Sequence, residues 1–123
     1  MLKLLIYIGT GSFLGGISRF LISKYFYHGS EFPYSTLLIN IAGSLLIGLL
    51  FGISEKSHLL SQEIKLFFTI GFCGSFTTFS TLSLESFTML KYGNYTQLAI
   101  YIGLSLIGGV TAVYLGYYSS KIF

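Results

Sequence analysis

Four long apolar segments occupy most of this 123-residue chain. They cover residues 4–26, 34–53, 64–90 and 95–118. Each is long enough to cross the apolar core of a bilayer as a helix, which takes about 20 mostly apolar residues. The connecting segments are short, so the spans leave no room for a separate domain outside the membrane. We therefore expect an all-α membrane protein in which residues 1–123 form a single four-helix transmembrane domain.

The charge content excludes several other classes of protein. Charged residues make up only 9% of the chain, against about 25% in a typical soluble domain. The seven lysines and arginines are too few for a surface that binds nucleic acid phosphates. A single cysteine excludes an intrachain disulfide and disfavours a cysteine-based metal centre. The chain contains no aspartate, which excludes Ser-His-Asp catalysis, and we predict that it is not an enzyme.

The third apolar segment contains a run that is unfavourable for a continuous helix. Residues 71–81 read GFCGSFTTFST, with two glycines and five hydroxyl-bearing residues. Glycine is a poor helix former, and Ser and Thr side chains offer the backbone other hydrogen-bond partners. We predict a break in the helix here, which is tolerable only if protein, water or an ion satisfies the freed backbone groups. The alternative is a continuous helix with a packing face of small residues.

Positive charges are divided almost evenly between the two ends of the spans. One side carries Lys3, Lys56, Lys65 and Lys121, and the other carries Lys24, Lys91 and Arg19. A chain with a fixed orientation normally has an excess of Lys and Arg on its cytoplasmic side. The balance predicts insertion in both orientations, so that antiparallel copies pair about an axis in the membrane plane. Chance balance among so few charges is the alternative.

Small residues recur at four-residue spacing in three of the spans. The pairs are Gly11 and Gly15, Gly48 and Gly52, and the series Gly108, Ala112 and Gly116. This spacing allows close helix packing in membranes. A chain with only four helices has few internal faces for such stripes, so we expect a homo-oligomer.

Three side chains are costly to place inside a membrane, and each has two readings. Arg19 either extends to the head groups or attracts anions at a vestibule. Asn40, on the same helix face as Thr36, either bonds across helices or uses its uncharged NH₂ group to hold an anion weakly. Glu85 either marks a proton or cation path, or it is protonated or accepts hydrogen bonds from nearby Ser and Thr side chains.

Aromatic and hydroxyl side chains add further candidates. Phenylalanine in a membrane usually faces lipid or the core, but the positive ring edges of Phe76 and Phe79 could meet a small anion in a dry pore. Tyr101 and Ser105 are four residues apart in the last span and could form a row of hydroxyl groups. Tyrosine is also typical of the membrane interface, which is the structural alternative.

Three motifs together resemble the CrcB/Fluc family of fluoride channels. They are GGxxR over residues 15–19, FPxxTxxxNxxG over 32–43, and GFCGSFTTFST over 71–81. The resemblance implies an antiparallel, dual-topology homodimer with two fluoride pores and a third helix that breaks mid-membrane. It also implies a structural Na⁺ at the dimer axis, held by the backbone carbonyls of Gly74 and Thr77 from both subunits.

The same resemblance assigns roles to the polar residues. Asn40 would donate to fluoride, Phe79 would turn its ring edge toward the ion, and Arg19 would lie in the vestibule. The remaining family positions are Ser80, Thr81, Ser83 and Glu85 around the pore or dimer axis, and Tyr101 and Ser105 in a polar track. Two positions depart from the family pattern, because Leu82 replaces a second phenylalanine and Gly109 carries no hydroxyl. Some members pair with an unlike subunit, and a degenerate site could reflect that.

The predicted function is passive, fluoride-selective conduction through the plasma membrane by a lipid-embedded, multi-pass homodimer. The chain has no P-loop, so ion gradients would supply the energy. The alternative is a small dual-topology multidrug exporter coupled to protons. That class requires an acid in the first helix and tends to use tryptophan, and this chain has neither.

Overall fold

The computed structural model describes residues 1–26, 32–56 and 60–122. In that part of the chain every regular element is helical. The elements are α1 (Leu2–Tyr25), α2 (Tyr34–Lys56), α3 (Gln62–Leu66), the π-helical η1 (Phe67–Cys73), α4 (Gly74–Phe76), α5 (Phe79–Lys91), α6 (Tyr95–Ser119) and the 3₁₀-helical η2 (Ser120–Ile122).

Within the described residues, four helical segments are long and apolar enough to cross a membrane. They are Leu2–Tyr25, Tyr34–Lys56, Gln62–Lys91 and Tyr95–Ile122. Their apolar faces are broadly exposed, and only seven apolar side chains of the described residues are buried. A helix that is apolar all round but exposed on most sides is suited to lipid as its solvent. The prediction of an all-helical protein with four spans is confirmed.

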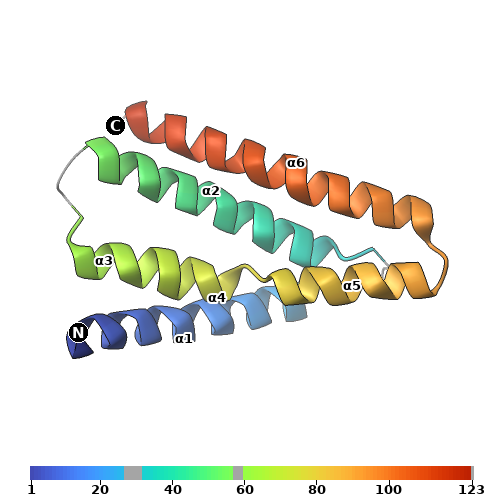
Figure 1. The fold of residues 1–123 in the computed structure, drawn as a ribbon, viewed down its shortest axis with the longest axis horizontal. Coiled ribbons are helices and arrows are strands. Elements are labelled where there is room, and N and C mark those ends of the chain that lie inside the picture. The colour runs from blue at the N-terminus through green and yellow to red at the C-terminus, as the bar shows by residue number, and fades with distance from the viewer. Residues whose placement is uncertain (27–31, 57–59, 123) are drawn as a thin grey trace.

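The helices form two pairs that run in opposite directions (Figure 1). α2 and α6 lie side by side and run the same way, while α1 lies along α3, η1 and α4. α5 continues the third span beyond α4 toward the start of α6. The third span therefore contacts α1 through its first half and approaches α6 only through its second half.

Glycines let the backbones of α2 and α6 come into contact. A Cβ atom added to Gly48 would lie 2.9 Å from the Cα and carbonyl carbon of Val113, and one added to Gly52 would lie 2.8 Å from the Tyr117 carbonyl oxygen. From the other side, a Cβ on Gly116 would lie 2.8 Å from the Leu49 nitrogen. Only a residue without a side chain fits these positions.

Glycines also let the backbones of α1 and the third span come into contact. A Cβ on Gly11 would lie 3.0 Å from the Phe72 nitrogen, and one on Gly15 would lie 3.1 Å from the Phe72 Cα. Gly71 approaches α1 from the other side, with the Ile8 carbonyl oxygen at 2.7 Å from its Cβ position. These small-residue stripes pack within one chain, so they do not by themselves indicate an oligomer as we expected.

The third span is broken at Thr77 and Thr78, which confirms the predicted interruption. Both residues are extended, with φ/ψ of −86°/150° and −148°/125° respectively. Two consecutive β-branched residues favour this conformation. The Thr78 hydroxyl accepts a hydrogen bond from the Thr81 N–H at 3.4 Å and caps the new helix. The break thus divides the span into a first half ending at Phe76 and a second half beginning at Phe79.

Candidate functional site

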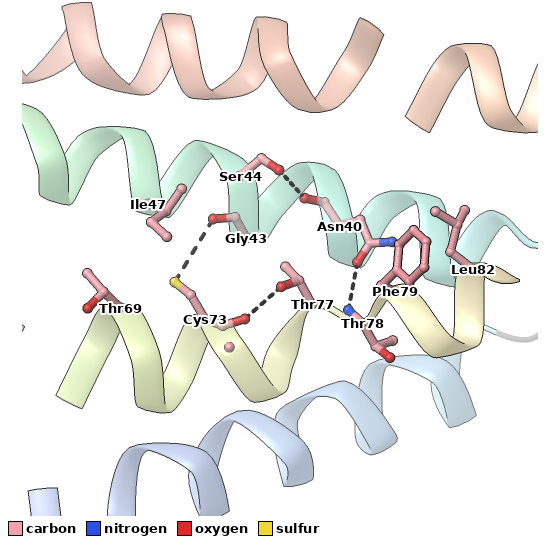
Figure 2. A pocket seen from close by; sticks show the side chains of 11 residues that line it. Asn40, Gly43, Ser44, Ile47, Thr69, Cys73, Thr77, Thr78, Phe79 and Leu82 are labelled. Carbon is pink, nitrogen blue, oxygen red and sulfur yellow. Dashed lines mark hydrogen bonds between the residues drawn. The ribbon is translucent and has the colours of Figure 1, made fainter. Parts of the chain in front are cut away.

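An open pocket of about 380 Å³ lies where α2 faces the break (Figure 2). We call it the break pocket. Its lining residues are Asn40, Gly43, Ser44, Ile47, Thr69, Cys73, Gly74, Thr77, Thr78, Phe79 and Leu82. Four of the predicted pore and cation-site residues are therefore brought together here: Asn40, Phe79, Gly74 and Thr77.

The Asn40 side chain bonds directly to the broken backbone. The N–H of Thr78 donates to Asn40 Oδ1 at 3.2 Å, as Figure 2 shows. In a continuous helix that N–H would bond to the Gly74 carbonyl. Since the amide oxygen is used by the backbone, the NH₂ group is the part of Asn40 that is left to bind a ligand. Asn40 therefore combines a structural acceptor with an uncharged donor at the pocket.

Phe79 and Leu82 form the apolar wall of the break pocket. Phe79 is the first residue of α5, and 80% of its surface is exposed in the single chain. Leu82 lines the pocket one helical turn later. Phe76 behaves differently, because it is buried and stacks on Phe72 with ring centroids 5.3 Å apart. Of the two candidate rings, only that of Phe79 is available to a ligand.

The break frees two backbone carbonyls beside the pocket. The helical donors for the Gly74 and Thr77 carbonyls would be the N–H groups of Thr78 and Thr81. These N–H groups bond instead to Asn40 Oδ1 and Thr78 Oγ1. Carbonyls at the end of a broken helix lie at the negative end of its dipole and suit a hard cation such as Na⁺. The carbonyl chemistry at these two positions therefore fits a cation site.

Arg19 contacts the end of the first half of the third span. Its Nε donates to the Ser75 carbonyl oxygen at 3.4 Å. The Ser75 carbonyl is another of the groups that lose a helical donor at the break. Arg19 therefore contacts the broken span directly, and its hydrogen bond to Ser75 connects α1 to α4. The sequence motif selected Arg19 as a candidate but did not reveal this partner.

Glu85 lies in a second polar cluster, formed with α2 and α6. The Thr36 hydroxyl donates to Glu85 Oε1 at 2.6 Å, and the Tyr101 hydroxyl donates to Glu85 Oε2 at 3.2 Å. Tyr101 is completely buried and Thr36 nearly so. Glu85 also lines a second pocket of about 490 Å³, which is separate from the break pocket. The contact with Thr36 agrees with the reading in which Glu85 accepts from a Ser or Thr side chain, whereas the Tyr101 donor was not expected.

The remaining predicted hydroxyl residues are dispersed. Ser80 lies 3.0 Å from the Thr78 hydroxyl at the start of α5, and Thr81 contributes its backbone N–H to the cap. Ser83 is exposed on α5. Ser105 Oγ is buried and has no hydrogen-bond partner among the described residues. None of these four residues lines the break pocket, although Ser80 contacts the lining residue Thr78.

Ser44 is among the pocket residues that were not selected from the sequence as functional candidates. It lines the break pocket, and its hydroxyl donates to the Asn40 carbonyl at 2.7 Å. Ser44 follows Asn40 by four residues and Thr36 by eight, so all three share one face of α2. This four-residue spacing is the sequence pattern from which Ser44 could have been selected.

Comparison with known proteins identifies relatives along the whole chain. The family model described as CrcB-like protein, Camphor Resistance (CrcB), matches residues 6–117. A relative named fluoride-specific ion channel FluC from Azobacteroides pseudotrichonymphae is 41% identical, with both chains covered completely. A protein of the same name from Leptospira interrogans is 41% identical over 98% of this chain and 97% of the relative. Another from Bacteroides fragilis is 40% identical over 99% of each.

The match therefore spans all four helices and both polar clusters, at an identity that shows common descent. This multi-pass membrane protein belongs to the CrcB family.

Proposed function

We propose that this protein is a passive fluoride-selective channel of a bacterial inner membrane, and not an enzyme. The observation that carries the proposal is the position of Asn40. Its oxygen is held by the broken backbone, and its NH₂ group is left for a ligand at the break pocket. The relatives that match the whole chain carry the name of a fluoride-specific ion channel.

The chemistry of the break pocket suits a small, hard anion. Fluoride must exchange water for donors of comparable strength, and an uncharged amide holds it weakly enough for release. The edge of the exposed Phe79 ring adds a weak positive contact. A membrane potential that is negative inside favours anion exit by about 2.3 kcal/mol per 100 mV, so no other energy source is needed. In this proposal Arg19 lies in the vestibule, and Tyr101 and Ser105 form a polar track. Ser80, Thr81, Ser83 and Glu85 lie around the pore or the dimer axis, although they do not line the break pocket of the single chain.

The functional unit that we propose is an antiparallel homodimer with a structural Na⁺ at its axis. Two features support it. The break pocket is open and Phe79 is exposed in the single chain, although a pore must be enclosed. The freed carbonyls of Gly74 and Thr77 offer only part of a Na⁺ shell, which a second copy would complete. An unlike partner subunit would be an alternative source of the second half.

The orientation can be tested with one introduced cysteine. Cys73 is buried, so it should not react with a membrane-impermeant thiol reagent. In a Ser61→Cys variant the new thiol lies on an exposed residue before α3. If the dimer is antiparallel, the reagent should label equal fractions from the two sides of the vesicle. Labelling from one side alone would contradict dual topology.

The Na⁺ proposal can be tested through stability. Replacing Na⁺ by a bulky organic cation should lower the thermal stability of the purified dimer, because the freed carbonyls lose their partner. Restoring Na⁺ should reverse the change. Equal stability in both media would contradict the cation site without contradicting the pore.

The variant Asn40→Asp tests the pore directly. The carboxylate keeps an acceptor for the Thr78 N–H, so the break is preserved, but a negative charge replaces the NH₂ donor. We expect fluoride efflux from liposomes, followed with a fluoride electrode, to be abolished. Wild-type efflux in this variant would contradict the assignment.

A matched control is Gln62→Glu, which adds the same charge at the exposed start of α3. It should leave fluoride efflux unchanged. Replacing fluoride by chloride in the wild-type assay should reduce efflux strongly, and an imposed proton gradient should have no effect. If the efflux depended on the proton gradient, the alternative function of a proton-coupled multidrug exporter would be favoured.

A further inference from the structure

We propose that Ser44 is a second uncharged donor to the permeating anion, and that it supplies from α2 the hydroxyl that α6 lacks at Gly109. This inference rests on the proposed fluoride channel and names one more residue of its pathway. Three features of the structure carry it: the place of Ser44 in the break pocket, its position opposite Gly109, and the hydrogen bond that it now makes.

Ser44 lies in the break pocket together with Asn40. Both residues line it from the same face of α2, one helical turn apart (Figure 2). Phe79 lines the same pocket from α5. An anion that leaves the Asn40 amide along this face of α2 therefore meets the Ser44 hydroxyl next.

Across from Ser44, α6 has room and lacks a polar group. A Cβ atom added to Gly109 would lie 3.6 Å from Ser44 Oγ, which is an ordinary contact distance. One turn earlier on α6, Ser105 has a buried hydroxyl without a partner among the described residues. Tyr101 lies one turn before that. On this face of α6 the row of hydroxyl groups ends at Ser105. Beside Gly109, one turn later, the nearest hydroxyl group is that of Ser44 on α2.

The present hydrogen bond of Ser44 can be given up at low cost. Its hydroxyl donates to the Asn40 carbonyl at 2.7 Å. That carbonyl lies within α2, where the backbone N–H of Ser44 is its regular helical donor. Rotation of the hydroxyl toward an anion leaves the carbonyl satisfied and replaces a neutral acceptor by a charged one, which makes the stronger bond.

The first test is Ser44→Ala in the fluoride efflux assay. We expect the rate to fall roughly tenfold, the effect of losing one hydrogen bond to a charged acceptor. The variant should fold, because alanine is the better helix former and the released carbonyl keeps its backbone donor. A wild-type rate would overturn the proposal. If Ser44→Ala does not purify as folded protein, Ser44→Cys carries the same expectation, since a thiol of similar size is a weak donor.

The second test moves the hydroxyl to the facing helix. Because a Cβ atom at Gly109 would lie 3.6 Å from Ser44 Oγ, a serine there would place its hydroxyl near the one removed from Ser44, and adding Gly109→Ser to Ser44→Ala should recover most of the lost efflux. The matched control adds Gly109→Ala to Ser44→Ala, which supplies the same Cβ without the hydroxyl and should recover nothing. Failure of the serine to restore efflux, or equal recovery by alanine, would overturn the proposal.

The wild-type measurement separates this inference from the proposed function. If the wild-type protein releases fluoride and Ser44→Ala does so equally fast, only the role of Ser44 is wrong. If the wild-type protein releases no fluoride, the channel assignment itself fails.

Discussion

The α2–α6 pair and the broken third span satisfy their backbones in opposite ways. In α2 and α6 each helix bonds its own backbone, and glycines such as Gly48 and Gly116 bring the two helices into contact. At the break, backbone groups depend on side chains from other helices. Asn40 accepts from Thr78 N–H, and Arg19 donates to the Ser75 carbonyl.

This difference explains where a ligand can act. A regular helix has no spare backbone groups for an ion, because all of them are paired within the helix. The break has polar groups whose partners come from side chains and can be shared with a ligand. The α2–α6 pair serves as the scaffold, and in the proposed function the groups at the break act together with Asn40 and Ser44 of α2.

The largest loss of stability that we expect follows from a substitution between α2 and α6. Gly48→Ala would bring a Cβ to 2.9 Å from backbone atoms of Val113, which cannot move aside as a side chain would. Overpacking of this kind costs about 3 kcal/mol. The melting temperature of the protein in detergent micelles should therefore fall strongly.

Gly103→Ala is the control for that experiment. Gly103 lies on α6 like the glycines of the interface, but nothing in the described chain lies within 4 Å of its Cβ position. The melting temperature of this variant should be unchanged or slightly raised, because alanine is a better helix former than glycine. Equal stability of Gly48→Ala and wild type would contradict the close contact of α2 and α6. A large loss in Gly103→Ala would instead indicate that this face contacts a second copy.

The scaffold was more predictable from the sequence than the contacts at the break. The four spans follow from the length of the apolar segments, and the interruption follows from the glycines and threonines of residues 71–81. Partners such as Ser75 for Arg19 are far apart in the chain, and periodicity carries no information on them. The small-residue spacing was weaker evidence for a homo-oligomer, because Gly11 and Gly48 pack against helices of the same chain.

The next largest loss of stability should follow from removing the Asn40 oxygen that accepts a hydrogen bond at the break. Asn40→Ala leaves the Thr78 N–H without its partner, and an unsatisfied group of this kind costs about 1–3 kcal/mol. Asn40→Asp retains an acceptor oxygen and should remain closer to wild type in melting temperature, although both variants should lose fluoride efflux. If alanine and aspartate are equally stable, the Asn40 oxygen does not support the break.

A smaller effect should follow from Arg19→Ala. The Nε–carbonyl distance of 3.4 Å to Ser75 is long for a hydrogen bond, so we expect a loss of about 1 kcal/mol. Lys24→Ala, near the exposed end of the same helix, is the control and should be neutral. The two variants should be compared by thermal unfolding at constant salt. An equal effect of both would mean that the charge of α1 matters and the Ser75 contact does not.

The smallest effect should come from the ion pair between α1 and α3. Lys3 Nζ lies 3.5 Å from Glu63 Oε1, but the lysine side chain is 70% exposed. Exposed pairs contribute little, because water and salt screen them. After Lys3→Ala, Glu63 still lies in the first turn of α3, where the helix dipole favours a negative charge. The melting temperature should therefore stay within experimental error of wild type at both low and high salt. A clear, salt-dependent loss would mean that α1 is held to the third span by charge as well as by the glycine contacts at Gly11 and Gly15.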